Sequence, residues 1–271
     1  MRAAGLRNGL KCLLLVAAIA APAGAIGWLL ADRPGATLFA LCALMGAVGA
    51  WWLGDRALLG TLGARPYALA EDPMLRSTTD RLAAQLGVPA PRLALIADGF
   101  PRACLVGRGA ESTTLVVSTG LLSALPGPEL EAVIAHELAH AKSLDVLSQT
   151  WTVLFSSTLV EVTRIGGWFS RTLLYVLAPV GAAATHAMLS PKREFAADAL
   201  AASVVGWEHM ADALLRLDKA GDLVQFSAIV TSEPLWTVSP FDVSHGLARM
   251  FSTHPPVEKR VERLRKLSVA A

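Results

Sequence analysis

Two long stretches without charged residues open the chain. No charge lies between Lys11 and Asp32, and none lies between Arg33 and Asp55. Each stretch matches the roughly 20 apolar residues that a helix needs to cross a bilayer. The pattern therefore predicts two membrane-spanning helices joined by a tight turn from Asp32 to Gly35.

Basic residues flank these stretches on one side of the predicted membrane. The turn carries only Arg33 beside Asp32, whereas the outer flanks carry Arg2, Arg7, Lys11, Arg56, Arg65 and Arg76. Because Lys and Arg concentrate in cytoplasmic segments, we expect the N-terminus and the bulk of the chain to face the cytoplasm. This predicts a multi-pass protein of the inner or plasma membrane.

A cleaved secretory signal is the alternative for the first stretch. Ala23-Gly24-Ala25 offers small residues for cleavage after a basic start and an apolar core. Apolar sequence continues through Leu30, however, and a second apolar stretch follows at once. Two spans are therefore favoured, and processing at Ala25 would distinguish the alternatives.

The pattern changes to that of a folded domain after residue 68. A helix is predicted from Asp72 to Leu86, where Gly87 and Pro89 end it. Short β-like runs follow at Leu93–Ala97, Ala103–Val106 and Thr114–Ser118. Together these elements predict a helix packed on a small sheet.

Further helices are predicted in the second half of the chain. Pro126-Gly127-Pro128 begins the first of them, with acidic residues in its first turn, where the helix dipole favours them. Its apolar face consists of Leu130, Val133, Ile134, Leu138 and Ala141. Apolar stretches at Val146–Val160 and Leu173–Ser190 predict a hairpin in or against the membrane. The remainder from Lys192 is mainly helical, with Val257, Val261 and Leu264 on one face of the last helix.

Composition supports a membrane location and excludes other classes of function. Hydrophobic residues make up 54% of the 271 residues and the mean hydropathy is +0.48, more apolar than an ordinary soluble domain. Charged residues make up 17% and the formal net charge is +2, so we expect no nucleic-acid partner. Two of the three cysteines, Cys12 and Cys42, lie in apolar stretches, where neither disulfides nor a thiolate metal site is expected.

The segment His136-Glu137-Leu138-Ala139-His140 carries the candidate chemistry. Its histidines lie on one face of the predicted helix and can hold a single zinc ion. Glu137 is one position further round and can take a proton from a water at that metal. The segment therefore predicts metal-assisted hydrolysis of a peptide bond.

A catalytic zinc needs a third protein ligand. Glu194 is the best candidate, because the sequence from Arg193 to Asp198 predicts a helix start with Glu194 and Asp198 on one face. Asp198 could then accept the outer N–H of a ligand histidine. Glu194 can meet the histidines only if the intervening chain crosses the membrane an even number of times. Either a spanning or a shallow hairpin meets this condition.

With these residues, the chain resembles the HtpX-type membrane metallopeptidases, relatives of the CAAX prenyl endopeptidases in the gluzincin group. The resemblance covers nearly the whole chain and implies that Glu194 is the third ligand. It also implies endoproteolytic cleavage of misfolded or unneeded membrane proteins. Besides the paired N-terminal spans, the shared features are Ser118-Thr119-Gly120-Leu121-Leu122, His136 to His140 followed by Asp145, Ser190-Pro191-Lys192-Arg193-Glu194 through Asp198, and Thr253-His254-Pro255-Pro256 with Arg260.

The resemblance suggests roles for residues outside the metal ligands. His254 would donate to the oxyanion of the tetrahedral intermediate, although a lone histidine before two prolines can also be structural. Arg260 either orients nearby carboxylates or is solvated, and Asp145 either caps a helix or accepts a hydrogen bond from a ligand histidine. His186, His209 and His245 match no motif and are expected to be structural or surface residues.

One strand departs from the family pattern. In such enzymes the edge strand beside the zinc pairs with the substrate backbone, which implies this role for Ala103, Cys104, Leu105 and Val106. The family usually has Asn-Ala-Phe-Ala where this chain has Arg102-Ala103-Cys104-Leu105. The metal chemistry therefore carries over from the family, whereas the substrate preference does not.

We therefore expect a mainly helical α+β protein with about four transmembrane or membrane-associated helices and a gluzincin-like core with a small sheet. Residues 1–57 would form the N-terminal pair, and residues 58–271 a zinc metallopeptidase domain interrupted by a hairpin at about 146–190. The expected partners are one zinc ion, polypeptide substrates and the lipid bilayer. The alternatives are a periplasmic metallopeptidase or chaperone-protease and a non-catalytic membrane scaffold. The complete set of Glu137 and three ligands argues against the scaffold.

Overall fold

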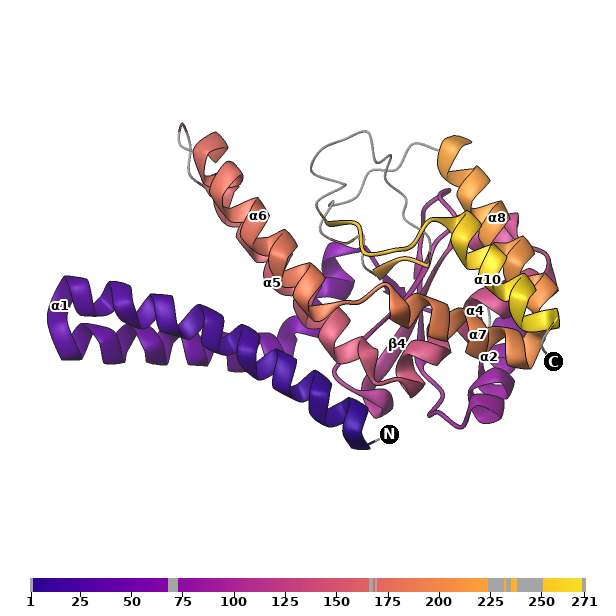
Figure 1. The fold of residues 1–271 in the computed structure, drawn as a ribbon, viewed down its shortest axis with the longest axis horizontal. Coiled ribbons are helices and arrows are strands. Elements are labelled where there is room, and N and C mark those ends of the chain that lie inside the picture. The colour runs from indigo at the N-terminus through magenta and orange to yellow at the C-terminus, as the bar shows by residue number, and fades with distance from the viewer. Residues whose placement is uncertain are drawn as a thin grey trace.

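Long apolar helices project from a core that combines helices with one sheet (Figure 1). The computed structural model describes residues 2–67, 73–165, 168, 170–223, 232, 235–237 and 251–269. Most of these residues are helical, and the strands form a single four-stranded sheet. The predicted mainly helical α+β class is therefore confirmed.

Helix α1 (Arg2–Thr61) doubles back on itself. Ala31 and Asp32 have non-helical dihedral angles, and Asp32 lies in the left-handed region with φ 48°. The helix therefore consists of two antiparallel arms, as the charge pattern predicts, with the reversal at the start of the expected turn (Figure 1). Gly27 and Gly35 face each other so closely that a Cβ on either would collide with the carbonyl oxygen of the other.

The arms of α1 are long, apolar and exposed. Residues 2–30 and 33–61 each extend roughly 44 Å at 1.5 Å per residue, more than the hydrocarbon core of a bilayer. Only 11% of the most apolar stretch of α1 is buried inside the protein. Leu29 and Met45 are 84% and 73% exposed. By length and composition, α1 can cross a membrane.

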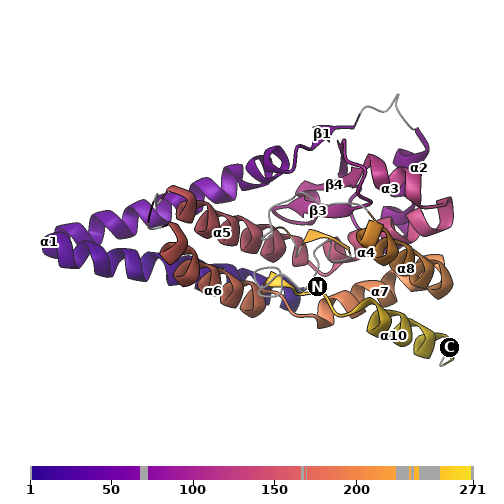
Figure 2. The ribbon, with the colours of Figure 1, turned by 90° about the horizontal axis from the view of Figure 1, so that it is seen from above.

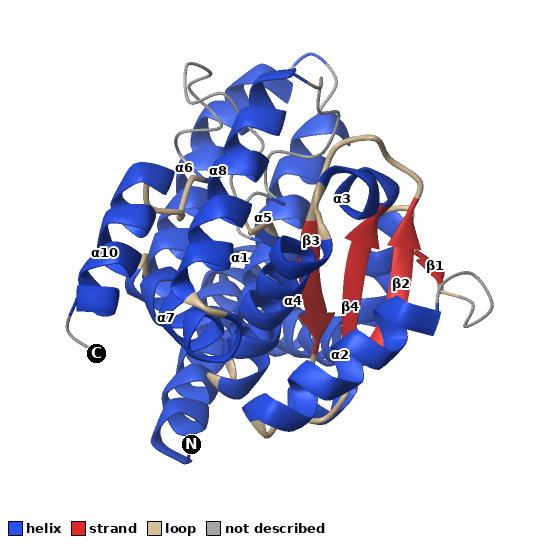
Figure 3. Cartoon of the chain, turned by 90° about the vertical axis from the view of Figure 1, so that its right-hand side faces the viewer, coloured by secondary structure: helices blue, strands red, loops and turns tan. Residues whose placement is uncertain are grey.

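The sheet has the strand order β1-β2-β4-β3 and places β3 at an edge (Figure 3). Strands β2 and β4 are parallel, whereas β1 with β2 and β3 with β4 are antiparallel. The three predicted runs are confirmed as β2, β3 and β4, and the sequence pattern missed the two-residue β1. The strands are β1 (Arg65–Pro66), β2 (Arg92–Ile96), β3 (Ala103–Gly107) and β4 (Thr113–Ser118). A short 3-10 turn, η1 (Ala110–Ser112), links β3 to β4.

Both faces of the sheet are covered. Successive residues of a strand point to opposite faces, so the strands carry apolar side chains on both sides. One face packs against α2 (Pro73–Leu86) and α4 (Gly127–Lys142), and the other packs against α1, α5 (Asp145–Ile165) and Trp236. The first face includes Leu95, Leu105 and Leu115, and the second includes Cys104, Val106 and Val116. This packing holds α4 directly beside the edge strand β3.

A hydrogen-bonded corner sets the start of the edge strand. The hydroxyl of Ser118 accepts from the backbone N–H groups of Arg102 and Leu121, both at 3.0 Å, and donates to the carbonyl of Phe100 at 2.7 Å. The same serine caps α3 (Thr119–Ala124), a short helix that the sequence pattern did not predict. At Gly120, a Cβ would collide with the backbone of the loop that precedes β3. The Ser-Thr-Gly segment therefore locks β3 against β4.

Helices α5 and α6 (Ser170–Met188) form a second hairpin, and α5 packs against α1 (Figure 2). Two packed helices occupy the apolar stretches that predicted a hairpin, and α5 continues to Ile165 although the charges after Val160 predicted an earlier end. The core is completed by α7 (Lys192–Val205) and α8 (Trp207–Leu223), which pack against α4, and by α10 (Val257–Val269), which packs against α7 and α8. Val257, Val261 and Leu264 are buried there, as predicted.

Candidate active site

Helix α4 presents three chemically active side chains to the interior. Its first turn carries Glu129, which pairs with Arg216 at 2.9 Å, and most of the following residues are buried. His136, Glu137 and His140 are 0%, 1% and 2% exposed. Such burial of polar groups is costly unless each has a partner, so the contacts of these side chains are informative.

Glu194 of α7 completes a cluster with the two histidines. One ligand atom from each of His136, His140 and Glu194 lies within 4.8 Å of the others. The nearest separations are 3.5 Å from His136 Nε2 to Glu194 Oε2 and 3.7 Å from His140 Nε2 to Glu194 Oε1. These distances are too long for good hydrogen bonds, but they suit three ligands around one cation.

The atoms that face the centre of this cluster have the character of metal ligands. His136 Nε2 and Glu194 Oε2 are buried and have no hydrogen-bond partner within the described part of the chain. Two imidazole nitrogens and one carboxylate are a common donor set for a catalytic zinc. The residues present therefore fit a zinc ion.

A buried ion pair supports His136 from behind. Asp198 Oδ1 lies 2.9 Å from His136 Nδ1, so the other ring nitrogen is directed toward the cluster. Arg260 is fully buried and donates to both oxygens of Asp198, through Nε at 2.8 Å and Nη2 at 2.7 Å. Burial alone would raise the pKa of Asp198, but the guanidinium of Arg260 outweighs it and lowers this pKa to about 2.

The two glutamates of the site have opposite electrostatic environments. Burial raises the pKa of Glu137, although His136 and His140 oppose the shift. Burial also favours the neutral form of Glu194, but its electrostatic interactions with His254, His140 and Arg193 hold its pKa well below the usual range. The site therefore keeps one carboxylate as an anion and makes the other a stronger base.

His254 and Asp145 lie at the edge of the cluster. His254 Nε2 is 3.5 Å from Glu194 Oε2, and its side chain is 3% exposed. Asp145 Oδ2 is 3.8 Å from His140 Nδ1, and its other oxygen accepts from Asn8 at 3.3 Å. Asn8 also donates to the carbonyl of Leu144 at 2.9 Å, which ties the base of α1 to the turn between α4 and α5.

The remaining predicted residues are distributed as follows. Ala103, Cys104, Leu105 and Val106 form most of the edge strand β3, which contacts both α4 and α5. Of the alternatives for Arg260, the structure has the contact with a carboxylate and not the solvated side chain. Among the histidines without a motif, His186 and His209 are exposed, and His245 lies outside the described residues.

Sequence reasoning missed two polar residues at this site. Thr237 Oγ1 donates to Glu137 Oε1 at 2.6 Å, yet 100 positions separate these residues in the chain. Asn8 lies within the first apolar helix, about as far from the motif as the chain allows. Neither residue belongs to a recognisable motif, so no sequence signal could have identified them.

The fold and the buried His-His-Glu cluster define a zinc metalloprotease. Residues 69–268 match Peptidase family M48, and the chain belongs to this family. Its metal site consists of His136, His140 and Glu194. The predicted resemblance is thus confirmed, and polypeptides are the substrates that a peptidase implies.

Relatives of nearly the same length share about a third of the sequence. The chain is 34% identical to a "Protease HtpX homolog" of Acidiphilium cryptum, over 96% of this chain and 97% of that one. Homologs of the same description in Pelotomaculum thermopropionicum and Pyrococcus abyssi are each 32% identical, covering 97% and 98% of this chain and 100% and 98% of their own. The crystal structure of S. mikatae Ste24p has a similar fold, with a TM-score of 0.52 and 16% identity. That match covers 97% of this chain and 66% of the Ste24p chain.

Proposed function

We propose that this protein is a membrane-integrated zinc endopeptidase that cleaves misfolded or unneeded membrane proteins from the cytoplasmic side. The observation that carries this proposal is the position of the metal cluster at the base of the apolar hairpins. Asp145 begins α5 close to His140, and Met188 ends α6 shortly before Glu194. The hairpin of α5 and α6 is therefore inserted between the metal ligands along the chain.

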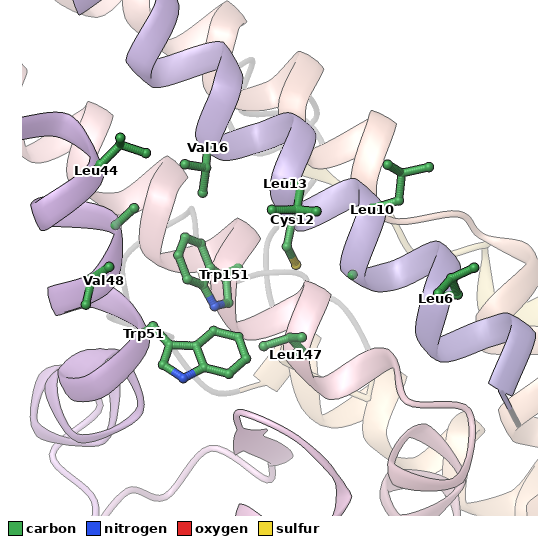
Figure 4. Close-up of a pocket in the computed structure, with 12 residues that line it drawn as sticks. Leu6, Leu10, Cys12, Leu13, Val16, Leu44, Val48, Trp51, Leu147 and Trp151 are labelled. Atoms are coloured by element: carbon green, nitrogen blue, oxygen red, sulfur yellow. The ribbon is translucent and has the colours of Figure 1, made fainter. Parts of the chain in front are cut away.

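Contacts at the base of α1 support the same arrangement. Lys11 Nζ donates to the carbonyl of Met188 at 2.6 Å, and Asn8 contacts the turn before α5. An apolar cavity of about 990 Å³ lies between the arms of α1 and the start of α5, where Trp51 and Trp151 face each other (Figure 4). Surfaces and cavities of this kind suit lipid tails better than water. With both hairpins in the bilayer, the catalytic cluster would lie near the lipid surface.

Both hairpins would cross the membrane twice, which keeps the catalytic core on one side. The basic residues at the ends of α1 support a cytoplasmic location for that side. We assign residues 1–57 to the N-terminal pair and residues 58–271 to the peptidase domain, with the second hairpin at about 146–190.

Glu137 would serve as the catalytic base. When bound at the His-His-Glu site, zinc supplies a Lewis acid that acidifies water and polarises a carbonyl. Glu137 would take a proton from the attacking water as the water oxygen bonds to the carbonyl carbon, so that an O–H bond of water breaks while a C–O bond and an O–H bond on Glu137 form. The same proton passes to the amine nitrogen as the peptide C–N bond breaks. Burial of Glu137 supports this role because it raises the proton affinity of the carboxylate.

The neighbouring polar residues would orient the ligands and the reacting carbonyl. Asp198 would fix the ring of His136, and Arg260 would hold Asp198 in place. Asp145 would act in the same way on His140. His254 would donate to the oxyanion of the tetrahedral intermediate, from its position beside Glu194.

The substrate would bind as an additional strand along β3. The backbone N–H of Ser118 donates to the carbonyl of Arg102 at 3.0 Å, so the hydrogen-bonding direction alternates from that residue onward. The backbone groups of Ala103 and Leu105 therefore point away from β4, on the side of β3 that has no partner strand in the described part of the chain, and both residues are 1% exposed. At the next outward position, the N–H of Gly107 donates to Thr150 of α5 at 3.2 Å, which would end the binding strand there.

Zinc content and cleavage in detergent test the central claim. Wild type, Glu137→Gln and the control Glu131→Gln would be compared; Glu131 lies on the same helix but pairs with Arg81 at 2.6 Å. We expect about one zinc per chain in all three and casein cleavage by all except Glu137→Gln. A wild type without zinc, or an active Glu137→Gln, would contradict the proposal.

A second comparison tests the membrane role. The same peptide segment would be presented either in a soluble protein or next to the membrane helix of a carrier protein, both reconstituted with the enzyme in vesicles. We expect faster cleavage of the membrane-bound form, because the cluster lies at the base of the hairpins. Equal rates in vesicles would contradict the membrane-protein specificity while leaving the zinc chemistry intact.

A further inference from the structure

The hydroxyl of Thr237 contacts the proposed catalytic base directly. It donates to Oε1 of Glu137 at 2.6 Å, and the two residues are 2% and 1% exposed. A hydroxyl bonded to a carboxylate in a dry environment forms a short, charge-assisted hydrogen bond. This contact therefore restricts the rotation of the Glu137 carboxylate.

Thr237 is itself held on both sides. Its carbonyl accepts from Arg260 Nη1 at 2.5 Å. The preceding residue, Trp236, is 1% exposed and belongs to the apolar cluster on the sheet face that includes Cys104 and Val106. The guanidinium of Arg102 lies 4.7 Å from the centre of the Trp236 ring. The residue that carries the hydroxyl is thus held against both the sheet and α10.

These contacts form a continuous chain through the site. His136 contacts Asp198, Asp198 binds Arg260, Arg260 binds the Thr237 carbonyl, and the Thr237 hydroxyl binds Glu137. One buried network therefore connects a metal ligand to the catalytic carboxylate. Such networks fix side-chain geometry more tightly than single contacts do.

We infer that Thr237 is a positioning residue for the reaction, whose hydroxyl holds Oε1 of Glu137 so that Oε2 is directed at the attacking water. This inference rests on the proposed role of Glu137 as the base. Proton transfer requires the accepting oxygen to be within hydrogen-bond reach of the water, and a small misplacement slows it greatly. Thr237 supplies that placement and does not itself exchange a proton.

Removal of the hydroxyl tests the inference. Thr237→Val keeps the shape of the side chain, Thr237→Ser keeps the hydroxyl, and Thr79→Val removes a buried hydroxyl that bonds to Leu75 in α2. A quenched peptide substrate in detergent would yield kcat and KM, with zinc content measured beside them. We expect Thr237→Val to lower kcat about 10- to 100-fold at unchanged KM and zinc content. The kcat of Thr237→Ser should stay within about threefold of the wild-type value, and the kcat of Thr79→Val should equal the wild-type value.

A binding measurement separates positioning from substrate contact. In the Glu137→Gln background, Thr237→Val should leave the Kd of a fluorescent uncleaved peptide unchanged, because the hydroxyl acts on Glu137. An unchanged kcat in Thr237→Val would overturn the inference. A raised kcat/KM in Thr237→Val would overturn it too, because the hydroxyl would then restrict access to the site. Weaker peptide binding by the variant would also overturn it.

Zinc retention and the Glu137 variant complete the test. If Thr237→Val loses zinc, Thr237→Ala removes the hydroxyl without a methyl group in its place, and zinc loss in both would assign the hydroxyl to the metal site and overturn the inference. An active Glu137→Gln would refute the proposed function itself. An inactive Glu137→Gln beside a fully active Thr237→Val would refute only the role of Thr237.

Discussion

Loss of one partner of the buried ion pair between Arg260 and Asp198 should strongly destabilise the catalytic core. Arg260 is fully buried, makes two hydrogen bonds to Asp198 and donates a third to Thr237. Arg260→Met keeps a side chain of similar length but leaves the Asp198 carboxylate buried without its cation. Breaking a buried pair in this way costs about 3–5 kcal/mol. At about 2–4 °C per kcal/mol for a domain of this size, Tm should fall by roughly 6–20 °C.

Thermal unfolding of the detergent-solubilised protein measures this effect. The matched control is Lys266→Met on the same helix, which removes an ion pair with Glu262 at 2.6 Å whose side chains are 73% and 64% exposed. This control should leave Tm nearly unchanged, because solvent screens an exposed pair. The double variant Arg260→Met with Asp198→Asn should regain part of the lost Tm, since no unpaired charge stays buried. If Arg260→Met and Lys266→Met have equal Tm values, the reasoning about the buried pair is refuted.

Three further predictions concern the metal, the Ser-Thr-Gly corner and the base of α1. Removal of zinc by a chelator should abolish cleavage and lower Tm, and added zinc should restore both; activity that survives complete removal of the metal would contradict the assignment. Gly120→Ala should lower Tm by several degrees, because its Cβ would collide with the carbonyl oxygen of Gly99, and an unchanged Tm would show that the corner can relax. Asn8→Ala should destabilise the protein by about 1–2 kcal/mol, because it removes hydrogen bonds to Leu144 and Asp145, and a wild-type unfolding curve would show that the arm is not fixed there.

Much of this architecture follows from local patterns. Charge-free stretches predicted both arms of α1, and a reversal of apolar helices needs little more than a break in the apolar pattern with Gly and Pro nearby. The strands β2, β3 and β4 were predicted because their residues are apolar and bounded by turn formers. The two-residue β1 was not, because so short a strand exists only through its pairing with β2.

The core of the site was also local in origin. His136 and His140 lie four residues apart in one helix, and this spacing alone places them on one face, with Glu137 one position further round. Glu194 was expected as a ligand from its helix start and from the resemblance to a family, and the structure brings it to the two histidines. The sequence by itself thus determined the metal-binding residues and the class of reaction.

Only the tertiary structure decided how these residues are held. Arg260, Thr237 and Asn8 reach the site from α10, from the segment at residues 235–237 and from α1, and each contact joins positions far apart in the chain. A hydrogen bond across 100 positions leaves no periodic trace in the sequence, because it depends on how whole elements pack. The direction of the Glu137 carboxylate, and the burial that tunes it, therefore belong to the fold and not to the motif.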